Sequence, residues 1–276
     1  MLYIYNFIFV IVSCLIRNTV EYLCNQGQAR SILRPLRRLF PMMCYPENCL
    51  IPSHADYLQG CISGQMYKVG YEFVMSNPVL EIDLKLTGIT PKDFLRYFYY
   101  AGICCTGMRN YTAAFENFTQ AYSLNGHSSI SSISVSAYKK AALLSLILKG
   151  KKIQPPLYAT ATLGKLEKYS KEYDAISVCY AKNDPILLRK FLSENEKLFI
   201  EDDNLGLAKK LIESSLRQRM KEISRTYVTL SIPDIVSQLQ VIINSFTMIL
   251  HIFNCHMLYQ AFECCRGRKV VTPPSS

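Results

Sequence analysis

The most constraining feature of this chain is a segment from Tyr97 to Asn125 that is rich in aromatic residues yet keeps small residues at intervals. Small residues let two helix backbones approach closely, and aromatic side chains then fill the space beside them. The spacing is close to that of a tetratricopeptide repeat, a unit of two antiparallel helices. The residues expected to hold this helix pair together are Phe98, Gly102, Tyr111, Ala114, Phe118 and Ala121.

The segment therefore predicts two helices joined by a turn near Gly107 to Asn110. Thr90 is expected to cap the first helix, with Pro91 at the first helical position and Asp93 in the first turn. One pair cannot bury its own apolar face, so neighbouring pairs should exist. The predicted fold class is all-α, a TPR-like helical-repeat solenoid.

Further helical patterns lie on both sides of this pair. Each is bounded by residues that cap or break helices, such as serine, aspartate, glycine and proline. The expected elements are two helices over 13–40, a pair over 53–75 capped by Ser53, a loop or short extended piece over 80–91, a helix over 137–150 ended by Gly150, pairs over 157–182 and 184–199, the second capped by Asp184, and a long amphipathic helix from Asn204 to about Arg225.

Composition and charge exclude some classes of protein. Hydrophobic residues make up 50% and charged residues 19% of the chain, which is too apolar for a disordered protein. The formal net charge of +10 permits anionic partners but identifies none. The 11 cysteines include no CxxC pair, which favours a reducing, intracellular compartment.

No motif for catalysis or metal binding is present. The chain contains no HExxH, no GxxxxGK[ST] and no GxSxG. The histidines of residues 251–256 and the pair Cys264–Cys265 match no structural zinc spacing. Cys104 and Cys105 lie inside the aromatic segment, where packing is the simpler interpretation. We expect no enzyme, no cofactor, no metal and no small-molecule substrate.

Basic runs and apolar ends leave some alternatives open. The runs at 34–39, 149–152 and 266–269 could touch nucleic acid or acidic partners, although a solvated face is the simpler interpretation. Residues 266–269 could also serve in nuclear import. The apolar stretches 1–16 and 241–259 could attach the chain to a membrane. The first is shorter than the ~20 residues of a membrane helix, and polar residues interrupt the second.

The predicted long helix and the residues around it resemble a known protein family. Residues 201–239 resemble the junction in PCI-domain proteins, where a helical-repeat array meets a winged-helix module. Within that group, residues 93–121, 137–151 and 201–240 are similar to the third-subunit family of the COP-nine signalosome, and residues 53–74 agree more loosely. The resemblance implies a junction with possible subunit contacts at Asn204, Leu205, Gly206, Leu207, Tyr227, Leu230, Ser231 and Ile235.

The resemblance implies a non-catalytic scaffold subunit in the cytoplasm and nucleus. The complex concerned removes the ubiquitin-like modifier Nedd8 from cullin-RING ubiquitin ligases and so regulates ubiquitin-dependent proteolysis. The implied partners are other signalosome subunits, with an indirect link to neddylated cullins, and no nucleic acid or membrane. A subunit of another PCI assembly, such as the proteasome lid or a translation initiation factor, is the rival interpretation.

The resemblance also divides the chain. Residues 1–12 are an apolar N-terminal extension, 13–200 the TPR-like repeats, and 201–240 the long helix with the start of a winged helix. Family members would continue with a recognition helix, two wing strands and a terminal helix. Residues 241–276 instead form a divergent apolar segment with a basic, Pro/Ser-containing tail, so the winged-helix module is expected to be incomplete.

Overall fold

A computed structural model describes residues 2–43, 49–124, 130–154, 156, 159–182 and 184–226 of the chain. Over these ranges the fold is all-α, and the sole β-type pairing is an isolated bridge between Cys49 and Glu81. The elements are α1 (Leu2–Asn25), α2 (Arg30–Leu39), the 3-10 helix η1 (Phe40–Met42), α3 (Pro52–Ser63), α4 (Tyr67–Ser76), α5 (Leu84–Thr87), α6 (Pro91–Gly107), α7 (Tyr111–Ser123), α8 (Ser132–Lys149), α9 (Thr160–Lys168), α10 (Lys171–Ala181), α11 (Pro185–Glu194), α12 (Glu196–Glu201) and α13 (Leu205–Thr226).

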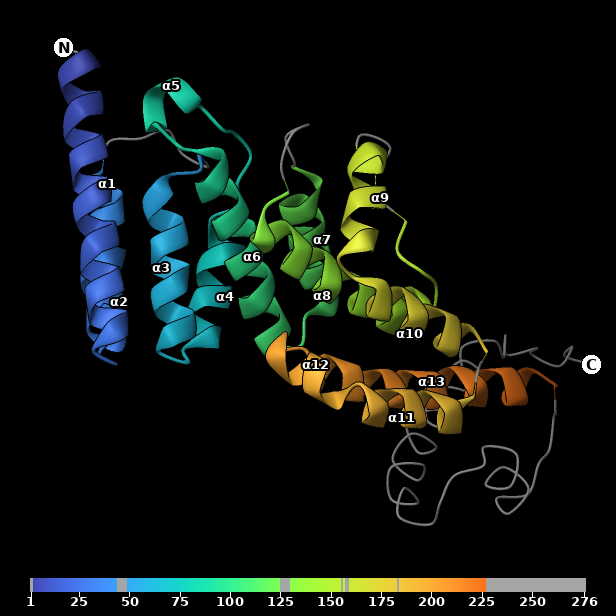
Figure 1. The fold of residues 1–276 in the computed structure, drawn as a ribbon. Coiled ribbons are helices and arrows are strands. Elements are labelled where there is room, and N and C mark those ends of the chain that lie inside the picture. Colours follow the sequence, from blue (N-terminus) through green and yellow to red (C-terminus); the bar gives the residue numbers. More distant parts are fainter. Residues whose placement is uncertain are drawn as a thin grey trace, which may run out of the picture.

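The helices stack in series into an α-helical solenoid. Figure 1 shows α1 to α4 and α6 to α8 in a row, with α1 at one end and the short α5 above the row, and α10 to α13 lying across the lower part of the other end. Packing follows this order: α1 lies on α3, α3 on α6, α6 on α7, α7 on α8, and α8 on α13. The predicted fold class is therefore confirmed for a helical solenoid. The winged-helix part of that prediction falls beyond residue 226, outside the described residues.

Local capping residues set several of the observed helix ends. Thr90 accepts a hydrogen bond from the Asp93 backbone N–H, and the Asp93 carboxylate accepts one from the Thr90 N–H, which together form a capping box. Asp184 accepts hydrogen bonds from the backbone of Ile186 and Leu187 at the start of α11. Gly150 ends α8 in the left-handed conformation, at a φ of 66°, where glycine costs least.

Ser53 does not cap α3, contrary to the sequence prediction. The helix begins one residue earlier, at Pro52, after the extended backbone of Ile51. Proline carries no N–H and suits the first helical position, so the start moves to it. The Ser53 hydroxyl instead donates a hydrogen bond of 3.4 Å to Ser13 Oγ of α1.

Two further elements differ from the sequence prediction. The helix predicted from residue 137 begins at Ser132, because Ser131 caps it by accepting a hydrogen bond from the Ile133 N–H. Serine is a weak helix former but a strong N-cap, so the first residue of a helix is hard to predict within a serine-rich stretch. Within residues 80–91, where a loop or extended piece was predicted, the chain forms the short helix α5.

The first helix is longer than the apolar pattern indicated. α1 runs without a break from Leu2 through the boundary at residues 12 and 13 that the sequence suggested. Its inner face buries Ile16 and Val20 against the neighbouring helices. Among the helices that the structure describes, none combines the length and apolarity that a membrane crossing needs.

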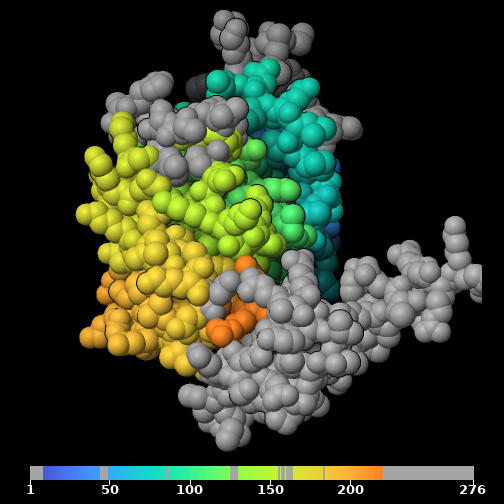
Figure 2. Space-filling view, turned by 90° about the vertical axis from the view of Figure 1, so that its right-hand side faces the viewer, coloured from blue at the N-terminus to red at the C-terminus, as the bar shows by residue number. Residues whose placement is uncertain are grey.

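Two groups of buried side chains form the interior. The first core runs from Ile16 to Cys104 and the second core from Cys105 to Leu211. Helix α6 lies between the two cores, since its consecutive residues Cys104 and Cys105 belong to the first and the second core respectively. Leu211 of α13 belongs to the second core, so the long helix packs together with the repeats. Figure 2 shows the later segments, in yellow and orange, closely packed against the green segments.

Candidate functional site

The aromatic helix pair is the centre of the solenoid. Ala114, Phe118 and Ala121 of α7 are fully buried in the second core. On α6, Gly102 lies directly against Phe118: a Cβ at Gly102 would come within 2.6 Å of Phe118 Cε1. Glycine is therefore required here by a close helix–helix approach. The pair α6–α7 brings together the small and large residues that the spacing singled out.

The two remaining residues of that set lie at the edges of the pair. Phe98 is partly buried, and its ring lies 4.5 Å from the Phe94 ring, between the two cores. Tyr111 is also partly buried, at the start of α7. It lines a groove described below and is half-buried, whereas Phe118, which also borders that groove, is fully buried.

A second cluster, the junction network, joins α8, α10 and the turn before α13. Asn204 Nδ2 donates to the Tyr173 hydroxyl at 2.7 Å, and Lys140 Nζ donates to Asn204 Oδ1 at 2.7 Å. The Tyr173 hydroxyl donates to Asp202 Oδ2 at 2.8 Å, and Lys139 Nζ also binds that carboxylate. Asn204 is buried, so this network fixes where α13 starts relative to the repeats.

The other predicted junction residues divide into two groups. Leu207 is buried, Leu205 is half-buried, and Gly206 is exposed at the first turn of α13. The predicted residues Tyr227, Leu230, Ser231 and Ile235 lie outside the described residues. The structure therefore places the first four junction residues together and does not locate the others.

Lys140 makes the junction network sensitive to alkaline pH. Burial lowers the pKa of Lys140 to about 8, against the opposing attraction of Asp203 and Asp202. A lysine with a lowered folded pKa binds fewer protons in the native state than in the unfolded state. Its contribution to stability therefore rises as pH increases from about 8 toward the unfolded value near 10.5.

Replacing Lys140 with methionine is expected to remove this pH dependence. The free energy of unfolding of the unmodified chain minus that of Lys140→Met should increase between about pH 7.5 and pH 9.5, because only the former holds the titrating amine. Urea unfolding followed by circular dichroism across this range measures the difference. Lys165→Met, at an exposed lysine of α9, is the control. A difference that stays flat or falls would contradict the assignment.

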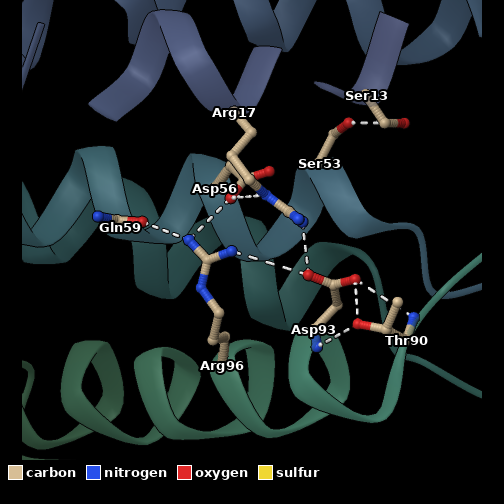
Figure 3. A network of polar contacts seen from close by, with 8 residues as sticks. All are labelled: Ser13, Arg17, Ser53, Asp56, Gln59, Thr90, Asp93 and Arg96. Atoms are coloured by element: carbon tan, nitrogen blue, oxygen red, sulfur yellow. Dashed lines mark hydrogen bonds and ion pairs between the residues drawn. The ribbon is translucent and has the colours of Figure 1, made fainter. Parts of the chain in front are cut away.

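A third cluster, the arginine–aspartate network, connects α1, α3 and α6 (Figure 3). Arg96 Nη2 lies 2.9 Å from Asp56 Oδ1, and Arg96 Nη1 lies 3.7 Å from Asp93 Oδ1. Arg17 reaches from α1 to both carboxylates, with its Nε 3.4 Å from Asp56 Oδ1. Asp56, Asp93 and Arg96 are buried, and Gln59 accepts a further hydrogen bond from Arg96.

The burial of Asp56 opposes its ionisation. Burial raises the pKa of Asp56 above its ordinary value, while Arg96 and then Arg17 act to lower it. Its second oxygen, Oδ2, has no hydrogen-bond partner among the described residues. The guanidinium groups of Arg96 and Arg17 therefore offset the free-energy cost of burying the charged Asp56 carboxylate between three helices.

Four of the described cysteines and His54 are buried in the interior, whereas Cys14 is exposed and Cys24 and Cys179 are half-buried. Burial raises the pKa of Cys105 to about 11, and it raises that of Cys104 further. Both remain thiols, which are poor nucleophiles at neutral pH. Burial lowers the pKa of His54 to about 3, and its ring lies 5.2 Å from that of Phe40. Within the described ranges, no three His, Cys, Asp or Glu side chains are grouped to hold a metal ion.

Two hollows, of about 400 Å³ and about 330 Å³, border α13 where it faces the carboxyl ends of α8 and α6, and Tyr111 lines both. The larger hollow lies between the end of α8 and α13, and the smaller lies between the end of α6 and the start of α13. We call this surface the α13 groove.

Sequence reasoning missed the charged networks. Arg17, Asp56 and Arg96 were not singled out, because the contacts that join the three helices link residues far apart in the chain, 39 positions for Arg17–Asp56 and 76 for Arg17–Asp93. The available signal was the presence of Asp56 and Arg96 inside otherwise apolar helices, since buried charges are normally paired. Lys140 carried the same signal within α8, whose other buried residues are mostly apolar.

Comparisons with known proteins agree with this architecture. A family model described as "COP9 signalosome complex subunit 3, N-terminal helical repeats" matches residues 6–163. The COP9 signalosome complex subunit 3 of Arabidopsis thaliana is 29% identical over 214 residues, which cover 75% of this chain and 48% of that protein. The protein of the same name from Dictyostelium discoideum is 31% identical over 194 residues, 70% of this chain and 46% of that protein. The chain spans about half the length of these curated relatives.

Proposed function

This chain belongs to the COP9 signalosome complex subunit 3 family, and we propose that it acts as a non-catalytic scaffold subunit of that complex. The observation that carries the proposal is the match of residues 6–163 to the helical repeats of this family, together with the solenoid that those residues form. A solenoid offers extended surfaces along its length, which suits the binding of several protein partners at once.

The chemistry of the interior supports the non-catalytic part of the proposal. The buried charged groups of the arginine–aspartate and junction networks bind one another, the backbone or the Asn204 side chain. The buried thiols of Cys104 and Cys105 have raised pKa values, which suits packing and not nucleophilic attack. Through its partners, the chain would contribute to removal of Nedd8 from cullin-RING ligases and so to ubiquitin-dependent proteolysis. Its expected location is the cytoplasm and the nucleus.

Affinity purification of the tagged full chain from its own cells, followed by mass spectrometry, tests the proposal. We expect the other signalosome subunits to be recovered together with the chain. The matched control is the tagged Gly102→Arg variant, which should recover none of them because its helix pair cannot pack. Recovery of proteasome-lid or initiation-factor subunits instead would replace this proposal with the rival assembly. Recovery of the chain alone or with membranes would contradict a scaffold role.

A further inference from the structure

The α13 groove carries more positive charge than its own carboxylates balance. Its lining includes two carboxylates, Asp203 and Glu213, and five cations: Arg109, Lys140, Lys149, Lys210 and Arg217. Lys210 and Arg217 both bind Glu213. Burial opposes the ionisation of Glu213, yet these two cations and Arg109 lower its pKa below the ordinary value. Glu213 is therefore already neutralised within the groove.

Two of the groove cations are exposed and make no direct ion pair with a carboxylate among the described residues, although Arg109 acts on Glu213 at longer range. Arg109 follows the end of α6, and its side chain makes no hydrogen bond or ion pair there. Lys149 ends α8, and its Nζ lies 4.6 Å above the Phe115 ring, a contact that leaves its charge available. They lie in the two hollows on either side of Tyr111.

Apolar side chains alternate with these charges. Tyr111, Ile147 and Leu148 line the larger hollow, and Leu148 is 40% exposed. Ile103 and Leu207 line the smaller hollow. A surface of this kind binds a chain that carries both apolar and negatively charged side chains, because each kind of contact meets its complement.

We propose that the α13 groove is a docking site for a segment of a partner protein that carries both acidic residues and apolar residues such as leucine. Arg109 and Lys149 would bind its carboxylates, and Tyr111 and Leu148 its apolar side chains. The inference goes beyond the scaffold role, because it names a surface and a ligand chemistry that would hold in any protein complex.

Charge disfavours the other occupants of the groove. A second copy of this chain carries a net charge of +10, and its residues 227–276 contain three Lys or Arg against two Asp or Glu, so neither complements a basic groove. A nucleic-acid backbone would leave the apolar side chains of the groove without a partner. An acidic peptide satisfies both features.

Arg109 offers a variant that separates binding from folding. Its backbone is left-handed, with a φ of 60°, and its N–H and that of Asn110 donate to Thr106 and Cys105 at the end of α6. Glycine is the favoured residue at such a position. Arg109→Gly therefore removes the guanidinium without straining the turn, and its thermal midpoint should equal or exceed that of the unmodified chain.

The test is a fluorescence anisotropy titration of the full chain against a short fluorescein-labelled peptide of glutamate and leucine. We expect saturable binding that weakens with added salt, and binding about two- to fivefold weaker for Arg109→Gly and for Lys149→Gln, the range expected for one exposed charge contact. Arg38→Gln is the matched control, since it removes an exposed positive charge on α2, at the opposite end of the solenoid (Figure 1). It should bind as the unmodified chain does.

Four outcomes would overturn the proposal. The first is no saturable binding of the peptide. The second is an equal loss in Arg38→Gln, which would indicate attraction by net charge alone. The third is tighter binding of labelled single-stranded oligothymidylate than of the peptide, which would assign the groove to nucleic acid. The fourth is a dimer in analytical ultracentrifugation that Arg109→Gly dissociates, which would assign the groove to a second copy.

Discussion

Gly102→Arg is expected to destabilise the chain by about 3 kcal/mol or more, because it drives a long charged side chain into a fully packed helix contact. Even a Cβ at this position would come within 2.6 Å of the Phe118 ring, and Phe118 is itself completely buried. The arginine could reach water only by separating α6 from α7. Urea unfolding followed by circular dichroism measures the loss.

A matched substitution controls for the effect of arginine itself. Gly164 lies within α9, and a Cβ there would meet no atom within 4 Å. Gly164→Arg should therefore be neutral or stabilising by up to about 1 kcal/mol, since arginine favours helices more than glycine does. Ala114→Glu, at another fully buried position of the pair, should behave like Gly102→Arg. Unchanged unfolding of Gly102→Arg and Ala114→Glu would show that the pair is not packed as described.

Arg96→Met is expected to cost about 3–5 kcal/mol, the range observed when one partner of a buried ion pair is removed. Among the cations of this network, Asp56 and Asp93 would keep Arg17 alone, whose side chain is 30% exposed and reaches them from another helix. The control is Lys152→Met, which breaks ion pairs of similar length, 2.9 and 3.0 Å, at a lysine that is 48% exposed. Pairs of this exposed kind contribute about 0–1 kcal/mol.

The pH dependence of Arg96→Met distinguishes an unpaired charge from a simple loss of packing. Burial already raises the folded pKa of Asp56, and loss of Arg96 removes the largest opposing influence. A carboxyl whose folded pKa is raised binds more protons in the native state, so it stabilises the fold below its unfolded pKa and loses that contribution as pH rises. The loss in free energy of unfolding that Arg96→Met causes should thus be larger at about pH 7 than at about pH 4. A deficit independent of pH would indicate that only packing was lost.

Features that depend on neighbouring residues could be predicted from the sequence. The caps at Thr90 and Asp184 involve partners two or three positions away, and both are observed. The aromatic pair could be predicted because helical spacing places Gly102 and Phe118 on facing surfaces of the two helices. The long helix near Asn204 could be predicted from its amphipathic pattern, although its first helical residue is Leu205.

Features that depend on distant partners could not be predicted. Arg17 and Asp93 are 76 positions apart, and no local pattern pairs them. Ser53 has the composition of a cap, yet the proline before it takes the helix start and leaves the serine to bond with α1. The α13 groove likewise arises only where the ends of α6 and α8 meet a helix that follows much later in the chain.

The division of the interior at α6 has a consequence for synthesis on the ribosome. Every buried member of the first core lies between Ile16 and Cys104, and every buried member of the second lies after them. Chains fold from the amino end as they emerge, so the first core can close while the second is still being translated. Until α7 and α8 emerge, the far side of α6 would present an apolar surface to solvent. That interval is when the nascent chain most needs a chaperone or an early partner.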